Sequence, residues 1–143
     1  MIVGMNPYLV TNGNGQEAVK FYEQALGAQV LNLQTFGDMP ENPEYPTPPE
    51  AKDRVMHALM KVGESSLMLS DTFPGQPFQL GTQVSIALHF DDAEHAKQVF
   101  GKLEDGGQVG MPIQETFWSP AYGMVTDKFG VLWQISTQPA EQK

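Results

Sequence analysis

Two segments of the chain place apolar residues at the spacing of an amphipathic helix. In the segment Gln16–Leu26, the apolar positions follow the i, i+3, i+4, i+7, i+8 pattern and comprise Ala18, Phe21, Tyr22, Ala25 and Leu26. In a later segment, the apolar face comprises Ala93, Ala96, Val99, Phe100 and Leu103. Gly27 follows the first segment and Gly106-Gly107 the second, where glycine commonly ends a helix. The pattern therefore predicts two helices, each with one buried face.

The remaining apolar segments alternate or are rich in β-branched residues, as strands are. We predict strands at Met5–Thr11, Gln29–Phe36, Arg54–Val62, Ser65–Asp71, Val84–Phe90, Gln108–Thr116, Tyr122–Thr126 and Val131–Ser136. Asp91 and Glu94 have the spacing of a capping box before the second helix. Gly37–Asp53 holds five prolines, which cannot donate within a sheet, so we expect a long loop there. A loop of this length is either a lid or a plain insertion.

The predicted elements repeat as strand, helix and three strands in each half of the chain. Ala18 and Tyr22 recur as Ala96 and Phe100, 78 residues later. This order favours a duplicated βαβββ unit in an α+β domain over a doubly wound parallel sheet, which needs more alternating helices. We therefore predict a single domain with a first module at about 1–72, a connection at 73–82 and a second module at about 83–137.

Composition and charge exclude several classes of function. The chain has 143 residues and a formal net charge of −9, which argues against binding nucleic acids or anionic lipids. It has no cysteine, which excludes disulfides, thiol nucleophiles and cysteine-ligated metals. There is neither an apolar run of about 18 residues nor a signal-peptide pattern, so we expect a cytoplasmic protein. The acidity is interpreted as a contribution to solubility.

Several short motifs, in this order and spacing, resemble the PhnB-like branch of the glyoxalase/bleomycin-resistance/dioxygenase superfamily, which has the vicinal oxygen chelate fold. They are Asn6-Pro7-Tyr8-Leu9, Glu17-Ala18, Phe21-Tyr22, Leu26-Gly27, Met56-His57-Ala58, Ser70-Asp71, Trp118, Tyr122-Gly123 and Asp127-x-Phe129-Gly130-x-x-Trp133. The resemblance implies two βαβββ modules that form curled mixed sheets around a cleft. It also implies a homodimer.

The resemblance further implies which positions face the cleft. Metal enzymes of the family place His and Glu ligands on the first, fourth, fifth and last strands, and the matching residues here are Asn6, Met68, Ser85 and Gln134. Amide and hydroxyl oxygens bind divalent metals weakly, and a thioether suits only soft metals. We therefore expect no metal and no cofactor, and ligand binding by these residues instead.

Four further residues are candidates for the same site, and three of them have a structural alternative. His57 is a candidate general base or a hydrogen-bonded core histidine. Trp118 and Tyr122 bracket a short turn and suit stacking on a planar ligand, core packing or a dimer contact. Tyr8 alternates with Asn6 and shares its face as a lining residue.

Two other patterns have competing interpretations. Gly13-Asn14-Gly15-Gln16-Glu17-Ala18 matches the dinucleotide fingerprint, but the chain lacks the repeated parallel βαβ units of that fold, so we interpret it as a turn before a helix. Asp71 ends a strand, where a carboxylate either caps a loop or acts as an acid or base.

Three functional hypotheses follow. The leading one is metal-independent binding of a small organic molecule, with no nucleic acid or membrane partner. The second is an enzyme of the superfamily, a lyase, isomerase or dioxygenase, that uses His57 as its base. The third is a metal enzyme with relocated ligands, drawn from His57, Asp71 and either Glu64 or His89.

Overall fold

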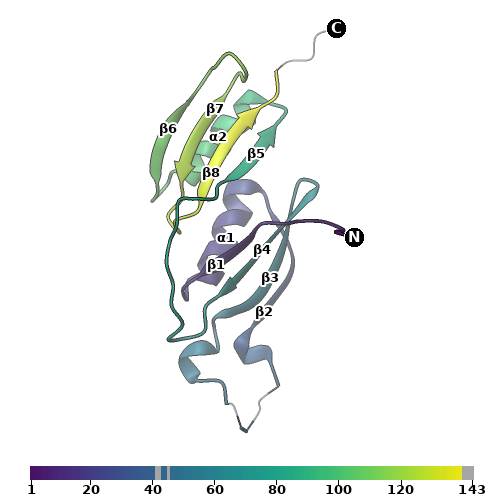
Figure 1. Cartoon of the computed structure of the whole chain (residues 1–143), viewed down its shortest axis with the longest axis vertical. Helices are drawn as coiled ribbons and strands as arrows, with labels where there is room; N and C mark the ends of the chain where they lie inside the picture. The colour runs from purple at the N-terminus through teal and green to yellow at the C-terminus, as the bar shows by residue number, and fades with distance from the viewer. Residues whose placement is uncertain (41–42, 45, 140–143) are drawn as a thin grey trace. The chain divides into compact units, whose positions relative to one another are not determined.

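The computed structural model describes residues 1–40, 43–44 and 46–139, and the chain forms two compact units, Met1–Gln79 and Leu80–Lys143 (Figure 1). The division falls inside the connection at 73–82. Among the described residues, neither helix has the length and apolar character that crossing a bilayer requires.

The first unit contains one helix and four strands. They are β1 (Tyr8–Thr11), α1 (Gly15–Leu26), β2 (Gln29–Thr35), β3 (Val55–Val62) and β4 (Ser65–Asp71). The sheet order is β1-β4-β3-β2, with β1 parallel to β4 and the other pairs antiparallel. The helix therefore crosses from one edge strand of the sheet to the other.

The second unit repeats this arrangement. It contains β5 (Ile86–Phe90), α2 (Ala93–Leu103), β6 (Gln108–Gln114), β7 (Tyr122–Thr126) and β8 (Leu132–Thr137). The sheet order β5-β8-β7-β6 matches that of the first unit strand for strand, including the parallel pair. The predicted α+β architecture of two βαβββ modules is thus confirmed, with two open four-stranded mixed sheets.

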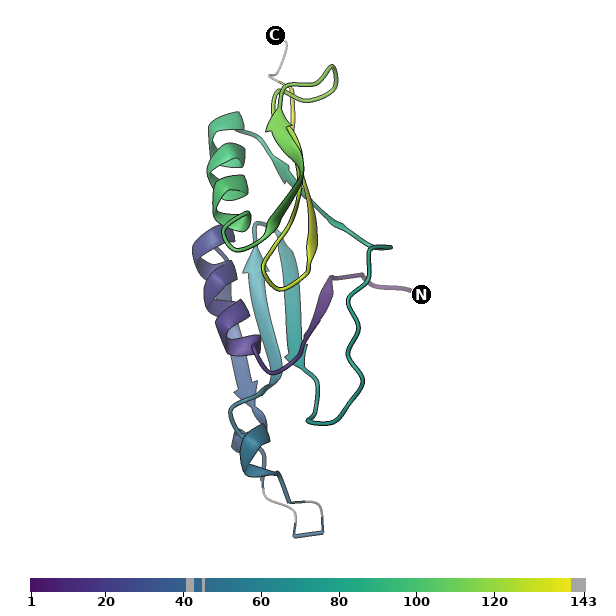
Figure 2. The same cartoon turned by 90° about the vertical axis from the view of Figure 1, so that its left-hand side faces the viewer.

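In each unit the helix covers one face of its own sheet (Figure 2). The core of the first unit joins Ala18, Val19, Tyr22 and Ala25 of α1 to Val55, Ala58, Met60, Leu67 and Leu69. The core of the second joins Ala96, Val99, Phe100 and Leu103 of α2 to Val125, Trp133 and Ile135. Because side chains alternate along a strand, the residues between these core positions lie on the opposite face of each sheet, which we call the open face.

Several predicted boundaries were wrong by a few residues. The first strand begins at Tyr8 rather than Met5, since Pro7 has no amide hydrogen to donate to the ladder. The fifth strand begins at Ile86 rather than Val84, so Ser85 precedes it, as Asn6 precedes the first. Strands predicted to end at Phe36 and Thr116 end at Thr35 and Gln114.

The predicted loop and cap also need correction. Single 3-10 turns at Phe36–Asp38 and Pro49–Ala51 interrupt the proline-rich segment. Positions 41, 42 and 45 of that segment lie outside the described residues. The N-cap of α2 is Asp92 rather than Asp91, because its carboxylate accepts from the amides of Glu94 and His95 at 3.4 and 3.3 Å.

Candidate functional site

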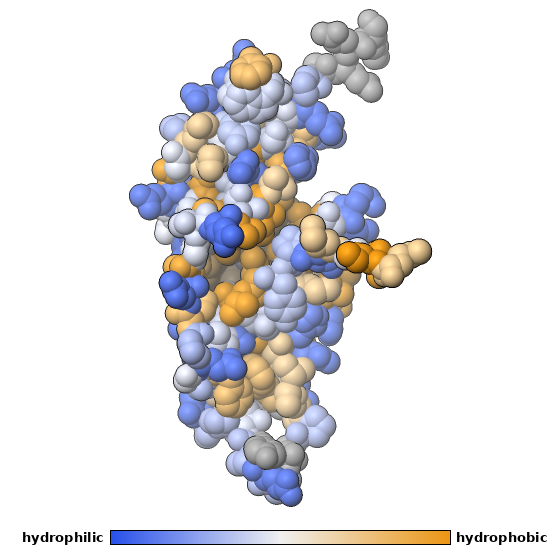
Figure 3. All heavy atoms as spheres, viewed as in Figure 1, coloured by the Kyte–Doolittle hydropathy of each residue, from blue (hydrophilic) through white to orange (hydrophobic). Residues whose placement is uncertain are grey.

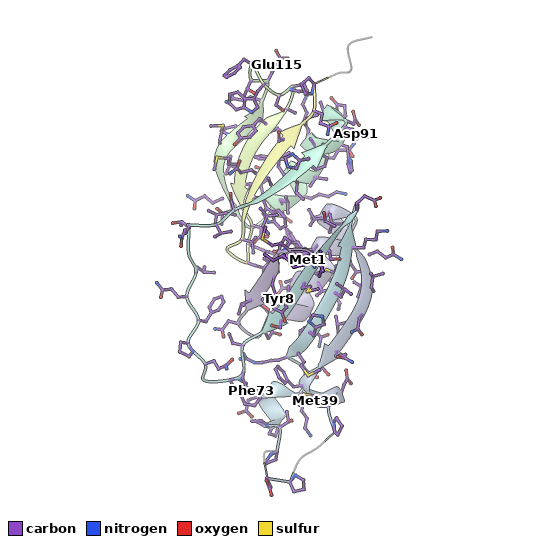
Figure 4. The ribbon with its side chains drawn as sticks, turned by 45° about the vertical axis from the view of Figure 1, so that its right-hand side comes forward. Met1, Tyr8, Met39, Phe73, Asp91 and Glu115 are labelled. Atoms are coloured by element: carbon purple, nitrogen blue, oxygen red, sulfur yellow. The ribbon has the colours of Figure 1, made fainter. Side chains whose placement is uncertain are left out.

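The open face of the first unit brings together three of the predicted site residues. Tyr8 lies opposite Met68 in the parallel β1–β4 pair, so the two side chains share a face. The hydroxyl of Tyr8, labelled in Figure 4, lies 3.4 Å from Nδ1 of His57 on β3, and the two ring centroids are 6.0 Å apart. Asn6 is exposed ahead of β1. This face therefore presents a phenol, an imidazole and a thioether.

The open face of the second unit holds a chain of hydrogen bonds between three predicted residues. The hydroxyl of Tyr122 on β7 donates to Oε1 of Gln134 on β8 at 2.9 Å. Nε2 of Gln134 in turn donates to Oγ of Ser85, just ahead of β5, also at 2.9 Å. We call these three residues the relay. The strands bring Ser85 and Gln134 together across 49 residues of sequence.

Two aromatic rings extend the relay at the loop between β6 and β7. Trp118 packs edge-to-face against Tyr122 with centroids 5.3 Å apart, and Phe117 packs the same way against Trp118 at 4.7 Å. Glu115, labelled in Figure 4, stands at the start of this loop. Trp118 and Tyr122 are therefore in contact, as a stacking surface requires.

Ser119 fixes that loop, a role that its sequence context did not predict. Its buried hydroxyl donates to the carbonyl of Thr137 at 2.8 Å and accepts from the amide of the same residue at 3.0 Å. The amide of Ser119 also bonds to Oγ1 of Thr116 at 3.1 Å. A serine before a proline between aromatic residues was the only signal in the sequence. These bonds hold the loop to the end of β8.

Asp71 caps a loop, which was one of its two predicted roles. Its carboxylate is buried and accepts from Oγ1 of Thr11 at 2.7 Å and from the amides of Gly13, Gly15 and Val55 at 2.8, 2.9 and 2.7 Å. A Cβ on Gly15 would lie 2.6 Å from this carboxylate. The glycine-rich turn therefore surrounds a carboxylate of the protein itself, in the place where a dinucleotide fold would hold phosphate.

Ser85 and Gln134, which the resemblance matches to metal positions of the family, do not fit a divalent metal. Ser85 and Gln134 bond to each other, and the amide oxygen of Gln134 already accepts from Tyr122. Asp71, the carboxylate considered as a relocated ligand, uses its oxygens to bind four donors. Throughout residues 1–40, 43–44 and 46–139, no three His, Asp or Glu side chains gather in a metal-binding group.

Comparison with known proteins identifies the family. The model of the glyoxalase/bleomycin resistance protein/dioxygenase superfamily matches residues 4–135. The chain belongs to this superfamily. The match spans both βαβββ units, which agrees with their identical strand orders.

Three individual relatives are similar to the chain over nearly its whole length. Protein YjdN of Escherichia coli K12 is 34% identical over 139 residues, which cover 92% of this chain and 93% of YjdN. The crystal structure of PA1353 from Pseudomonas aeruginosa is 39% identical, with a TM-score of 0.84 over 96% of this chain and 98% of that one. A PhnB protein from Bacillus cereus has a TM-score of 0.75 at 22% identity, covering 93% and 98% of the two chains, and shows the shared fold.

The superfamily assignment confirms the predicted fold and family. The functional roles of Asn6, Tyr8, His57, Met68, Ser85, Trp118, Tyr122 and Gln134 stay predictions. Within each unit, the structure places these residues on or next to the open face, and in the second unit it connects them by hydrogen bonds and ring contacts.

Proposed function

We propose that this superfamily member binds a small organic molecule on its open sheet faces without using a metal ion. The observation that carries the proposal is the relay. At positions where metal enzymes of the family hold ligands, this chain has an amide and a hydroxyl that bond to each other and to Tyr122. Such groups orient a ligand through hydrogen bonds, whereas a catalytic divalent metal is typically held by carboxylate, imidazole or thiolate donors, and the chain has no cysteine.

A thermal-shift screen of a metabolite library, with and without EDTA, tests this proposal. We expect hits that raise the melting temperature equally in both conditions. Gln134→Leu removes both hydrogen bonds of the relay while keeping the side-chain volume similar, and should reduce the shift. Ser136→Ala removes a hydroxyl two residues further along β8, outside the relay, and is the matched control.

Metal analysis gives the result that would contradict the proposal. A stoichiometric transition metal in the purified protein, lost in Gln134→Leu or His57→Ala, would replace metal-free binding with metal chemistry. Loss of every hit on EDTA treatment would have the same meaning.

The second candidate function is an enzyme that uses His57 as a base. The observation that favours it is the 3.4 Å contact between Nδ1 of His57 and the hydroxyl of Tyr8. This contact orients the imidazole and leaves Nε2 to face a ligand. Turnover of a screening hit that His57→Ala abolishes, with binding retained, would establish the enzyme. Retained turnover in His57→Ala would exclude this role.

We also propose that the chain works as a homodimer in the cytoplasm. Apolar side chains are exposed along its N-terminal segment, at Met1, Ile2, Val3 and Met5, and this segment stands out in Figure 3. On the edge strand β1, Val10 is also exposed, and such an edge can pair with another chain. Solution scattering should give twice the chain mass of 15.8 kDa, and a monomeric mass would contradict the dimer.

A further inference from the structure

The relay on the open face of the second unit has a direction. Tyr122 donates its hydroxyl hydrogen to Gln134, and Gln134 donates an amide hydrogen to Ser85. Oγ of Ser85 is thus an acceptor in the relay, and its own hydrogen has no acceptor among the described residues. A ligand that meets this end of the relay therefore meets a hydrogen-bond donor.

The same face carries no lysine or arginine within residues 80–139. Lys97 and Lys102 belong to α2, which covers the opposite face of the sheet. Lys128 follows β7 and lies against the turn after α2, where its Cβ is 3.2 Å from the place of a Cβ on Gly106. The titratable side chains near the relay are His89, two residues along β5 from Ala87, and Glu115 on the aromatic loop. An anionic ligand would find no lysine or arginine partner on this face.

The aromatic side of the face is accessible. Trp118 keeps 47% of its surface exposed and Phe117 keeps 97%, although Ser119 anchors the loop that carries them. Exposed aromatic rings on an anchored loop form a ready stacking surface, because little order is lost when a ligand binds.

We propose that this face recognises a flat, conjugated molecule through an uncharged carbonyl oxygen rather than through a phosphonate, phosphate or carboxylate group. The ring stacks on Trp118, and the oxygen accepts the hydrogen of Ser85. An anion would meet one neutral donor and no lysine or arginine here, so its charge would gain little from this face. This inference rests on the proposed function and names the ligand class for its second-unit face.

Two matched probes test the inference, benzamide and phenylphosphonate, which share a phenyl ring and differ in the polar group. Binding is followed by NMR through the indole N–H of Trp118 and the side-chain amide of Gln134. Trp133 is 1% exposed and its Nε1 donates to Asp127 at 2.8 Å, so its indole signal is an internal reference. We expect benzamide to shift the first two signals with a Kd of about 10 mM, the range for a ligand of its size. Phenylphosphonate should bind about tenfold more weakly or not at all.

Variants separate the two contacts. Ser85→Ala should weaken benzamide about fivefold, which corresponds to one neutral hydrogen bond. Trp118→Leu, read from Gln134, should weaken benzamide by a similar factor, and Ser136→Ala should leave its affinity unchanged. Equal weakening by Ser136→Ala would contradict the assigned donor.

The outcomes distinguish this inference from the proposed function. Tighter binding of phenylphosphonate at the same signals would overturn the neutral-carbonyl inference and leave small-molecule binding in place. Absence of benzamide shifts at saturating concentration would overturn the inference, while hits from the metabolite screen that map to either open face would still support the proposed function. Failure of both would reject both.

Discussion

Asp71 offers the sharpest test of how the first unit is held together. Its carboxylate bonds to the end of β1, to the turn that follows, to the first residue of α1 and to the start of β3. Oδ1 accepts from Thr11, Gly13 and Gly15, and Oδ2 accepts from Val55. Two substitutions therefore remove different shares of these bonds. Asp71→Ala removes all four, whereas Asp71→Asn can keep the three made by Oδ1.

The magnitudes follow from which donors water can reach. Thr11, Gly15 and Val55 are buried, while Gly13 is exposed and can bond to solvent. Oγ1 of Thr11 keeps the carbonyl of Ser70 as an acceptor at 3.3 Å, so Asp71→Ala leaves the two buried amides of Gly15 and Val55 without an acceptor, at a cost of about 2–6 kcal/mol of unfolding free energy. In Asp71→Asn the amide group replaces Oδ2 and opposes the Val55 amide hydrogen, at a cost of about 2 kcal/mol.

Urea unfolding followed by far-UV circular dichroism measures both costs. Amide hydrogen exchange at Gly15 and Val55 shows which of the two hydrogen bonds each substitution removes. Exchange at Gly15 should stay slow in Asp71→Asn but not in Asp71→Ala. Asp53→Asn, an exposed carboxylate with the same chemical change, should be neutral within about 0.5 kcal/mol. The reasoning is refuted if Asn is as costly as Ala, or if Ala costs less than about 1 kcal/mol.

Further substitutions test other contacts through the same unfolding measurement. Thr137→Val should stabilise the protein by about 1 kcal/mol, because Oγ1 of Thr137 is buried without a hydrogen-bond partner. Thr11→Val should destabilise the protein, because it removes the bond to Asp71. A lower free energy of unfolding for Thr137→Val would contradict this reasoning. Gly123→Ala should cost about 1–3 kcal/mol, since its Cβ would lie 3.0 Å from the β6 backbone. Gly101→Ala, on the solvent-exposed side of α2, should raise the free energy of unfolding by about 0.5–1 kcal/mol. If both glycine substitutions changed this free energy in the same direction, the packing argument would be refuted. Tyr122→Phe should lower the free energy of unfolding by about 1 kcal/mol and leave Oε1 of Gln134 without its donor. Unchanged NMR signals of the Gln134 side-chain amide would exclude the relay.

Much of the fold could be predicted because it depends on local periodicity. The apolar spacing located both helices to within a residue, with Gly27 in the left-handed conformation (φ 68°) that ends α1. Alternation and β-branched residues located the eight strands of the described residues. Strand ends were less predictable, since Asn6, Val84 and Ser85 continue a strand pattern yet lack a pairing partner. Pairing depends on the neighbouring strand, which periodicity does not specify.

The candidate site, too, was predictable from the sequence only in part. The resemblance to the family selected Ser85 and Gln134. Their side chains, a hydroxyl and an amide, already argued against a metal. The bond between them depends on β5 pairing with β8 in parallel, a contact across 49 residues. Ser119 was missed because its importance comes from the backbone of Thr137 rather than from any neighbour in sequence.

The sequence by itself therefore determined the elements, their duplicated order and the family, since local side-chain patterns and short motifs encode them. Only the tertiary structure decided the direction of the relay, the role of Asp71 as the acceptor of the glycine-rich turn, and the absence of lysine and arginine from the described open face of the second unit. Each of these depends on which residues the parallel strand pairs place side by side, because hydrogen bonding and charge act through distance in space rather than along the chain.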